Sequence, residues 1–154
     1  MTALKWLLIV VSAGYACGLV VLFFAQRSLL FPIPTAERTT PQAAGFPEAQ
    51  EHILTTADGE KVIVWHVPAR PGHPVVLYFH GNGDFLAGFF GRFHDVIADG
   101  TGVVVLSYRG YAGSSGRPSE RGLLLDAAAA YAFTTARYSA DSIVVWGFSL
   151  GTGV

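Results

Sequence analysis

The chain has a single cysteine, Cys17, so no disulfide bond can form within it. It has no excess of basic residues either. Its formal net charge of -1 at pH 7 gives no electrostatic reason to expect a nucleic-acid partner. No histidine, aspartate or glutamate cluster has the spacing of metal ligands, and no metal or other cofactor is expected. The expected functions are therefore ones that need neither a metal nor another cofactor.

Nucleotide-binding signatures are also incomplete. Gly81-Asn82-Gly83 lies between a predicted strand and a predicted helix, as the glycines of a dinucleotide site would. That fingerprint needs a third glycine three positions after Gly83, where Leu86 stands, and no G-x-x-x-x-G-K-[ST] sequence occurs. A dinucleotide or phosphate site is therefore disfavoured.

A long apolar run is the first positive feature. From Trp6 to Ala25 the chain carries no charge for about 20 residues, enough helix to cross a membrane. We interpret residues 1–27 as an uncleaved, single-pass transmembrane anchor. Two alternatives are a cleaved signal peptide, whose apolar region would be shorter, and a buried core helix. Basic residues flank the run almost equally, so the side of the membrane that the rest of the chain faces is open.

Residues 28–50 are predicted to be a linker, because four prolines within them disfavour regular helix and central strand: Pro32, Pro34, Pro41 and Pro47. Residues 51–154 are predicted to fold as a domain that begins with a hairpin. Its arms, 51–56 and 61–67, flank Asp58-Gly59, which favours the positive φ angles of a tight turn. Both arms partly alternate apolar and polar residues, which predicts half-exposed antiparallel strands.

The later strands have a different pattern. Continuous apolar runs at 75–79, 103–106 and 143–146 are typical of parallel strands covered on both faces. Helices are predicted between them, at about 84–98 and 119–138. The sequence thus predicts an α/β fold in which an antiparallel hairpin leads into parallel strands with right-handed crossover helices.

The last of these strands is followed by Gly147-Phe148-Ser149-Leu150-Gly151. A G-x-S-x-G pattern alone is weak evidence, but a sharp turn directly after a buried strand exposes its apex serine as a nucleophile, which makes Ser149 the candidate catalytic residue. The backbone N–H groups of Leu150 and Asn82 are the candidate oxyanion hole. His80, Gly81 and Tyr108, at the same edge of the sheet, are the candidate substrate pocket.

With these motifs the sequence resembles the α/β-hydrolase superfamily, specifically its membrane-anchored serine hydrolases. The resemblance lies in five stretches, namely 26–32, 78–82, 107–116, 118–120 and 147–153, with Ala112 standing where such relatives often have glycine. It implies hydrolysis of a carboxylic ester, thioester or amide through an acyl-serine intermediate. The implied substrate is a small-molecule or lipid-like acyl compound.

The rest of a catalytic triad is the difficulty. In this fold an aspartate or glutamate and then a histidine follow the serine, whereas only five residues follow Ser149. Asp126 and Asp141 are expected to be structural or exposed, and Arg109 to hold its own loop. We therefore expect the N-terminal portion of a hydrolase, inactive as this fragment. The alternative is a noncatalytic, membrane-tethered α/β binding module.

Overall fold

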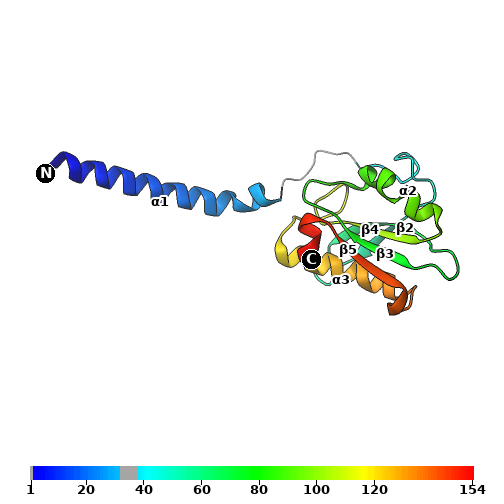
Figure 1. Ribbon diagram of the computed structural model, residues 1–154. Coiled ribbons are helices and arrows are strands. Elements are labelled where there is room, and N and C mark those ends of the chain that lie inside the picture. The colour runs from blue at the N-terminus through cyan, green and yellow to red at the C-terminus, as the bar shows by residue number, and fades with distance from the viewer. Residues whose placement is uncertain (1, 32–37) are drawn as a thin grey trace. The chain divides into compact units, whose positions relative to one another are not determined.

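The computed structural model describes residues 2–31 and 38–154, without the side chains of residues 89 and 90. Pro32 and Pro34 of the predicted linker lie outside the described residues. The chain divides into two compact units at Pro32. In the first unit, helix α1 (Thr2–Leu30) is continuous and buries none of its residues (Figure 1). By length and composition it can cross a membrane.

The second unit is built on a five-stranded sheet with the order β1-β2-β4-β3-β5. Its strands are β1 (Gln50–Thr55), β2 (Lys61–Val67), β3 (Val75–Phe79), β4 (Gly102–Ser107) and β5 (Ile143–Gly147). Strand β2 is antiparallel to β1 and to β4, and β3 is parallel to β4 and to β5. The predicted fold class is confirmed.

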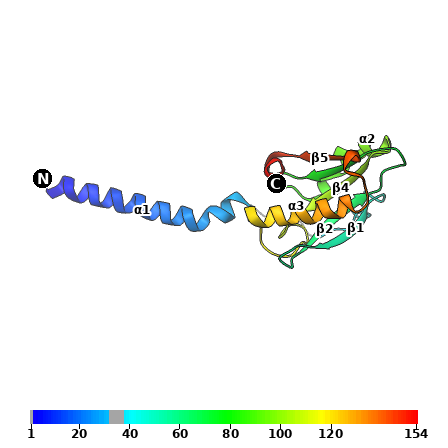
Figure 2. The same cartoon turned by 90° about the horizontal axis from the view of Figure 1, so that it is seen from below.

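Helices cover both faces of this sheet. A short 3-10 helix, η1 (Leu86–Phe89), and helix α2 (Phe90–Ala98) lie on one face, and α3 (Glu120–Thr135) lies on the other (Figures 1 and 2). Ser119 caps α3, because its side chain accepts a hydrogen bond from the Gly122 N–H at 3.2 Å. Two more 3-10 turns, η2 (Ala140–Ser142) and η3 (Ser149–Gly153), flank β5.

The core explains the apolar runs. Strands β3 and β4 are buried at every position because successive side chains point to opposite, covered faces. On the α2 face, Trp65 and Tyr78 pack with Phe93 and with Phe46, a residue of the predicted linker 28–50. The division of the chain into residues 1–27, 28–50 and 51–154 stays a prediction.

Strand β2 corrects one expectation. Its alternating pattern predicted a half-exposed strand, but six of its seven residues are buried. Strands β1 and β4 pair with its two edges, and both of its faces are covered: Trp65 contacts Phe46 on one, and His66 contacts Phe133 on the other. The polar residue that suggested exposure, His66, is 5% exposed.

The hairpin turn and the first helix also differ from expectation. In the turn only Gly59 has a positive φ, of 90°, so the turn does not need a left-handed Asp58. The Thr56 N–H donates to the Glu60 carbonyl and closes the loop at 2.9 Å. The helix predicted over 84–98 begins as η1 at Leu86 and becomes α-helical only at Phe90.

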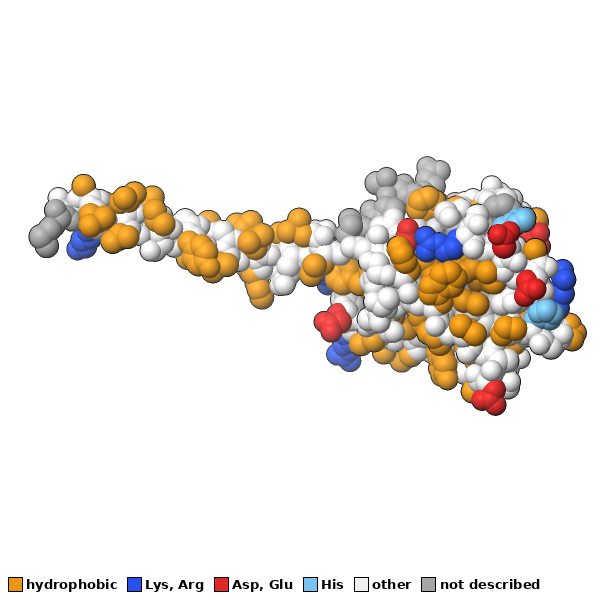
Figure 3. All heavy atoms as spheres, in the orientation of Figure 1, with side chains coloured by type: hydrophobic (Ala, Val, Ile, Leu, Met, Phe, Trp, Pro, Cys, Tyr) orange, Lys and Arg blue, Asp and Glu red, His pale blue; other side chains and the backbone are white. Residues whose placement is uncertain are grey.

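Strand β5 is the exposed end of the sheet. Val144 is 50% exposed, Val145 58% and Trp146 40%, so this strand, unlike β3 and β4, is not covered on both faces. The Trp146 ring does contact Tyr78 and Phe93, at centroid distances of 5.5 and 5.9 Å. Figure 3 shows apolar side chains gathered over the part of the domain where β5 lies.

Candidate active site

The turn after β5 has the geometry expected of a nucleophile elbow. Ser149 has a φ of 49°, in the left-handed region that side chains other than glycine rarely adopt. It is the first residue of η3, and its side chain is exposed. The backbone therefore turns sharply at Ser149 and leaves its hydroxyl open to solvent.

Two glycines make this turn possible. A Cβ added to Gly147 would lie 2.3 Å from the Gly151 carbonyl oxygen, and one added to Gly151 would lie 2.1 Å from the Phe79 carbonyl oxygen. Both distances are far inside van der Waals contact, so neither position accepts a side chain without movement of the backbone. Glycine is therefore required two residues before and two residues after Ser149.

The elbow lies directly against the turn that follows β3. The Phe148 N–H donates to the Phe79 carbonyl at 3.0 Å. A Cβ on Gly81 would lie 2.9 Å from the Phe148 ring, so Gly81 lets the two turns approach. The sequence suggests Asn82 and Leu150 as oxyanion donors. Asn82 directly follows Gly81, and Leu150 lies two residues after Phe148. The structure thus brings the two predicted donor segments together, and their role stays a prediction.

His80 is fully buried in the turn after β3. Its Nδ1 lies 2.7 Å from the Gly81 carbonyl oxygen, and because a carbonyl only accepts, Nδ1 carries the proton. Burial lowers the pKa of His80, which favours the neutral ring. The Gly81 N–H donates in turn to the Asp84 carboxylate at 3.1 Å. His80 and Gly81 therefore support the shape of this turn.

Tyr108 is the first residue of the corner after β4, which we define as residues 108–114. Its side chain is fully buried, its ring lies 4.3 Å from that of His80, and its hydroxyl donates to the His80 carbonyl at 3.3 Å. Burial raises the pKa of Tyr108, so the hydroxyl stays protonated as a donor. Its predicted place in a substrate pocket remains untested, and its observed contacts are with the loop beside it.

Arg109 holds the corner with two carboxylates, as the sequence suggested in part. Its backbone N–H and its Nε donate to the two oxygens of Asp126, at 2.8 and 2.9 Å. Its two terminal nitrogens donate to Asp58, at 2.7 and 3.0 Å. The hydrogen bond from Arg109 lowers the pKa of Asp58, whereas burial raises that of Asp126 against the opposing effect of Arg109. The sequence did not predict that Asp58 binds Arg109, because Asp58 directly precedes Gly59 and was interpreted only as a turn residue.

The described residues supply no base for Ser149. No hydrogen bond to the Ser149 hydroxyl is present in residues 2–31 and 38–154, and no three metal-ligating side chains gather there. His52 and His66 lie on the hairpin, and His73 lies in the loop between β2 and β3. His94 is exposed on α2, and His80 is engaged in its own turn.

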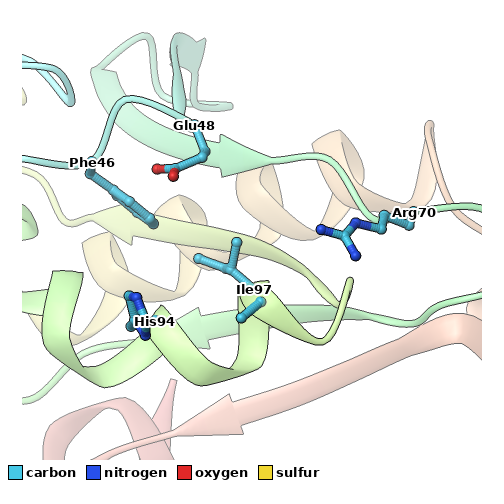
Figure 4. Close-up of a pocket in the computed structure, with 6 residues that line it drawn as sticks. Phe46, Glu48, Arg70, His94 and Ile97 are labelled. Carbon is cyan, nitrogen blue, oxygen red and sulfur yellow. The ribbon is translucent and has the colours of Figure 1, made fainter.

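A small pocket of about 180 Å³ lies elsewhere on the domain. Figure 4 shows Phe46 and Glu48 from the segment before β1, Arg70 from the β2–β3 loop, and His94 and Ile97 from α2 around it. Neither Ser149 nor any other predicted site residue lines this pocket. It is therefore separate from the candidate active site.

Comparison with known proteins agrees with this geometry. A family model described as alpha/beta hydrolase fold matches residues 74–154. The chain is 34% identical over 135 residues to the lysophosphatidylserine lipase ABHD12 of Danio rerio, covering 74% of this chain and 35% of that protein. It is 31% identical over 153 residues to an uncharacterized protein of Mycobacterium tuberculosis, covering 95% of this chain and 53% of that protein.

Among solved structures, the chain is similar in fold to the Pyrococcus furiosus esterase Pf2001. The TM-score is 0.62 and the identity 24%, with 80% of this chain and 50% of the esterase covered. This likeness concerns the fold alone. In each of these comparisons the chain spans between about a third and about half of the other protein.

Proposed function

The chain belongs to the α/β-hydrolase fold family, and from that premise we propose that it carries the nucleophile of a serine hydrolase. Ser149 attacks the carbonyl carbon of a carboxylic ester, thioester or amide. A bond forms from its oxygen to that carbon, its proton passes to a general base, and the bond to the leaving group breaks. Water then releases the acyl group from Ser149.

The observation that carries this proposal is the backbone of Ser149. A non-glycine residue at a φ of 49° is strained, and such strain gathers at functional sites. The exposure of the Ser149 side chain, in a turn that contacts the turn containing Asn82, supports this role. Main-chain N–H groups of Asn82 and Leu150 would stabilise the negative oxygen that forms during attack.

The base and its orienting acid are proposed to lie in the part of the fold that the longer relatives have and these 154 residues do not. A serine without a base is a weak nucleophile near pH 7. The 154-residue chain should therefore react slowly with an electrophile at Ser149 and should turn over little substrate.

The substrate and the location follow from the relatives and from α1. One relative is named a lysophosphatidylserine lipase, which favours a lipid-like acyl substrate here. Helix α1 is proposed to anchor the chain in a membrane as a single span. An anchored hydrolase meets amphipathic substrates at the surface where they concentrate.

A fluorophosphonate probe tests this function. Because it reacts with activated serines, mass spectrometry of the labelled chain should find the adduct on Ser149, and Ser149→Ala should remove it. Ser139→Ala, which changes another exposed serine, is the matched control and should keep the adduct. Labelling that survives Ser149→Ala, or that spreads evenly over several serines, would contradict the proposal.

The second candidate is a noncatalytic, membrane-tethered binding module. It is favoured by the lack of any hydrogen bond to the Ser149 hydroxyl among the described residues. A complete absence of labelling at Ser149 would support this alternative.

A further inference from the structure

We propose that Tyr111 is a positioning residue for the turn formed by residues 80–84, and through that turn for the oxyanion donor Asn82. This inference rests on the proposed function for its chemical meaning. Its structural content, that one tyrosine hydroxyl fixes the turn at Asn82, can be tested separately.

The contacts of Tyr111 reach the part of the turn that packing does not hold. Its side chain is fully buried, and its hydroxyl donates to the Asn82 side-chain oxygen at 3.1 Å. Asn82 and Gly83 are themselves exposed, so the directed hydrogen bond from Tyr111 to Asn82 takes the place of burial there.

The first two residues of the turn are held by different groups. The Tyr108 hydroxyl donates to the His80 carbonyl, and the Asp84 carboxylate accepts from the Gly81 N–H. Two tyrosines three residues apart thus bond to the first residue and to the middle residue of the turn. Tyr108 acts on the part that is already buried, and Tyr111 acts on the part that is exposed.

Tyr111 is itself rigidly placed. Its N–H donates to the Tyr108 carbonyl at 3.0 Å, and its carbonyl accepts from the Ser107 hydroxyl at 3.1 Å. Arg109, between the two tyrosines, is bound by Asp58 and Asp126. A side chain on so fixed a backbone can define the position of its hydroxyl, and hence of the group that it binds.

This placement matters because an oxyanion donor must lie within hydrogen-bond distance of one point in space. Displacements of about 1 Å in a supporting residue are enough to lower rates substantially. Without the Tyr111 hydroxyl, Asn82 loses one hydrogen bond and the exposed turn gains freedom. The phosphonyl oxygen of a fluorophosphonate that reacts with Ser149 would then be stabilised less well.

The test is Tyr111→Phe, which removes the hydroxyl and keeps the ring. We expect about a tenfold lower maximal rate of fluorophosphonate labelling at Ser149, with little change in the probe concentration that gives half that rate. Amide hydrogen exchange at Asn82 and Gly83 should become faster, while exchange in β3 and β4 stays as in the original chain. Tyr131→Phe, in an exposed tyrosine of α3, should change none of these quantities.

A second variant keeps the test decisive if Tyr111→Phe folds poorly. Asn82→Ala removes the acceptor from an exposed residue and should reproduce the faster exchange at Gly83, and the double variant should add nothing further. Unchanged exchange at residues 82 and 83 in both variants would overturn the inference. If the original chain is not labelled at Ser149 at all, the proposed function fails, and the exchange measurements still decide the role of Tyr111.

Discussion

Two turns at the same edge of the sheet are held in place in opposite ways. The elbow, residues 147–151, has no charged side chain, and backbone crowding at Gly147 and Gly151 fixes its shape. The corner, residues 108–114, is held by buried tyrosines and by the ion pairs of Arg109. Each turn contains one non-glycine residue with a positive φ, Ser149 at 49° and Ala112 at 39°. The same kind of backbone strain thus occurs in one turn that is crowded by backbone atoms and in one that is held by ion pairs and buried tyrosines.

The largest effect is expected from removing the charge that holds the corner. Arg109→Met leaves the Asp126 carboxylate fully buried without its partner, which should lower the free energy of unfolding by about 4 kcal/mol. Urea denaturation measures this change. Arg121→Met, at an exposed position of α3, is the control and should stay within about 0.5 kcal/mol. A loss below about 1 kcal/mol in Arg109→Met would show that the ion pairs do not hold the corner.

Breaking the elbow by steric means should have the next largest effect. Gly151→Ala places a Cβ 2.1 Å from the Phe79 carbonyl oxygen, so the chain must move, at a loss of about 3 kcal/mol. Gly153→Ala is a matched control, because nothing lies within 4 Å of its added Cβ. Equal urea midpoints for the two variants would remove the steric account of the elbow.

A pH titration tests a third buried group, His66 of β2, which lies outside both turns. Burial lowers the pKa of His66 to about 4, with His52 and Arg137 acting in the same direction. Unfolded histidine binds a proton below about pH 6.5, whereas folded His66 resists until about pH 4, so stability should fall as the pH drops between these values. We expect a loss of about 2 kcal/mol between pH 7 and pH 4.5.

This titration has a clear control. His66→Phe should reduce the dependence on pH, whereas His94→Gln, in an exposed histidine of α2, should leave it unchanged. Denaturation with urea at each pH provides the measurement. Stability that rises as the pH falls would contradict the predicted sign.

The smallest effect comes from relaxing the strained residue in each turn. Ala112→Gly and Ser149→Gly should each raise the free energy of unfolding by about 0.5–1 kcal/mol, because glycine adopts a positive φ without strain. Ala128→Gly, in the middle of α3, should instead lower it by about 1 kcal/mol. Thermal unfolding of the three variants checks the opposite signs. Destabilisation by Ala112→Gly would mean that its side chain contributes more than its backbone strain removes.

Much of the fold could be predicted because the apolar runs of the sequence and the turn residues between them indicate the same strand limits. The limits of β2 and β3 match their predicted ranges, 61–67 and 75–79, since apolar β-branched residues end at turn residues on both sides. Burial was harder to predict. His66 made β2 look half-exposed, but a polar residue can be buried where an aromatic helix residue and a tyrosine hydroxyl receive it.

In the candidate site, too, some features could be predicted from the sequence and others could not. The glycines around Ser149 could be predicted, because crowding in a sharp turn is a local property of the chain. The bonds from Arg109 to Asp58 and from Tyr111 to Asn82 could not, because they join residues 51 and 29 positions apart. Nothing in a single sequence pairs such residues. The departure at Ala112 is more than a neutral difference, since its φ of 39° is one that glycine adopts freely.

Strand β5 also determines how the domain behaves at high protein concentration. It ends the strand order, so one side of its backbone has no neighbouring strand among the described residues, and its apolar side chains are exposed on both faces. Such an edge is a template on which a second molecule can add a strand. Self-association will therefore compete with unfolding and with probe binding, and each midpoint should be shown to be independent of dilution before it is taken as a property of the monomer.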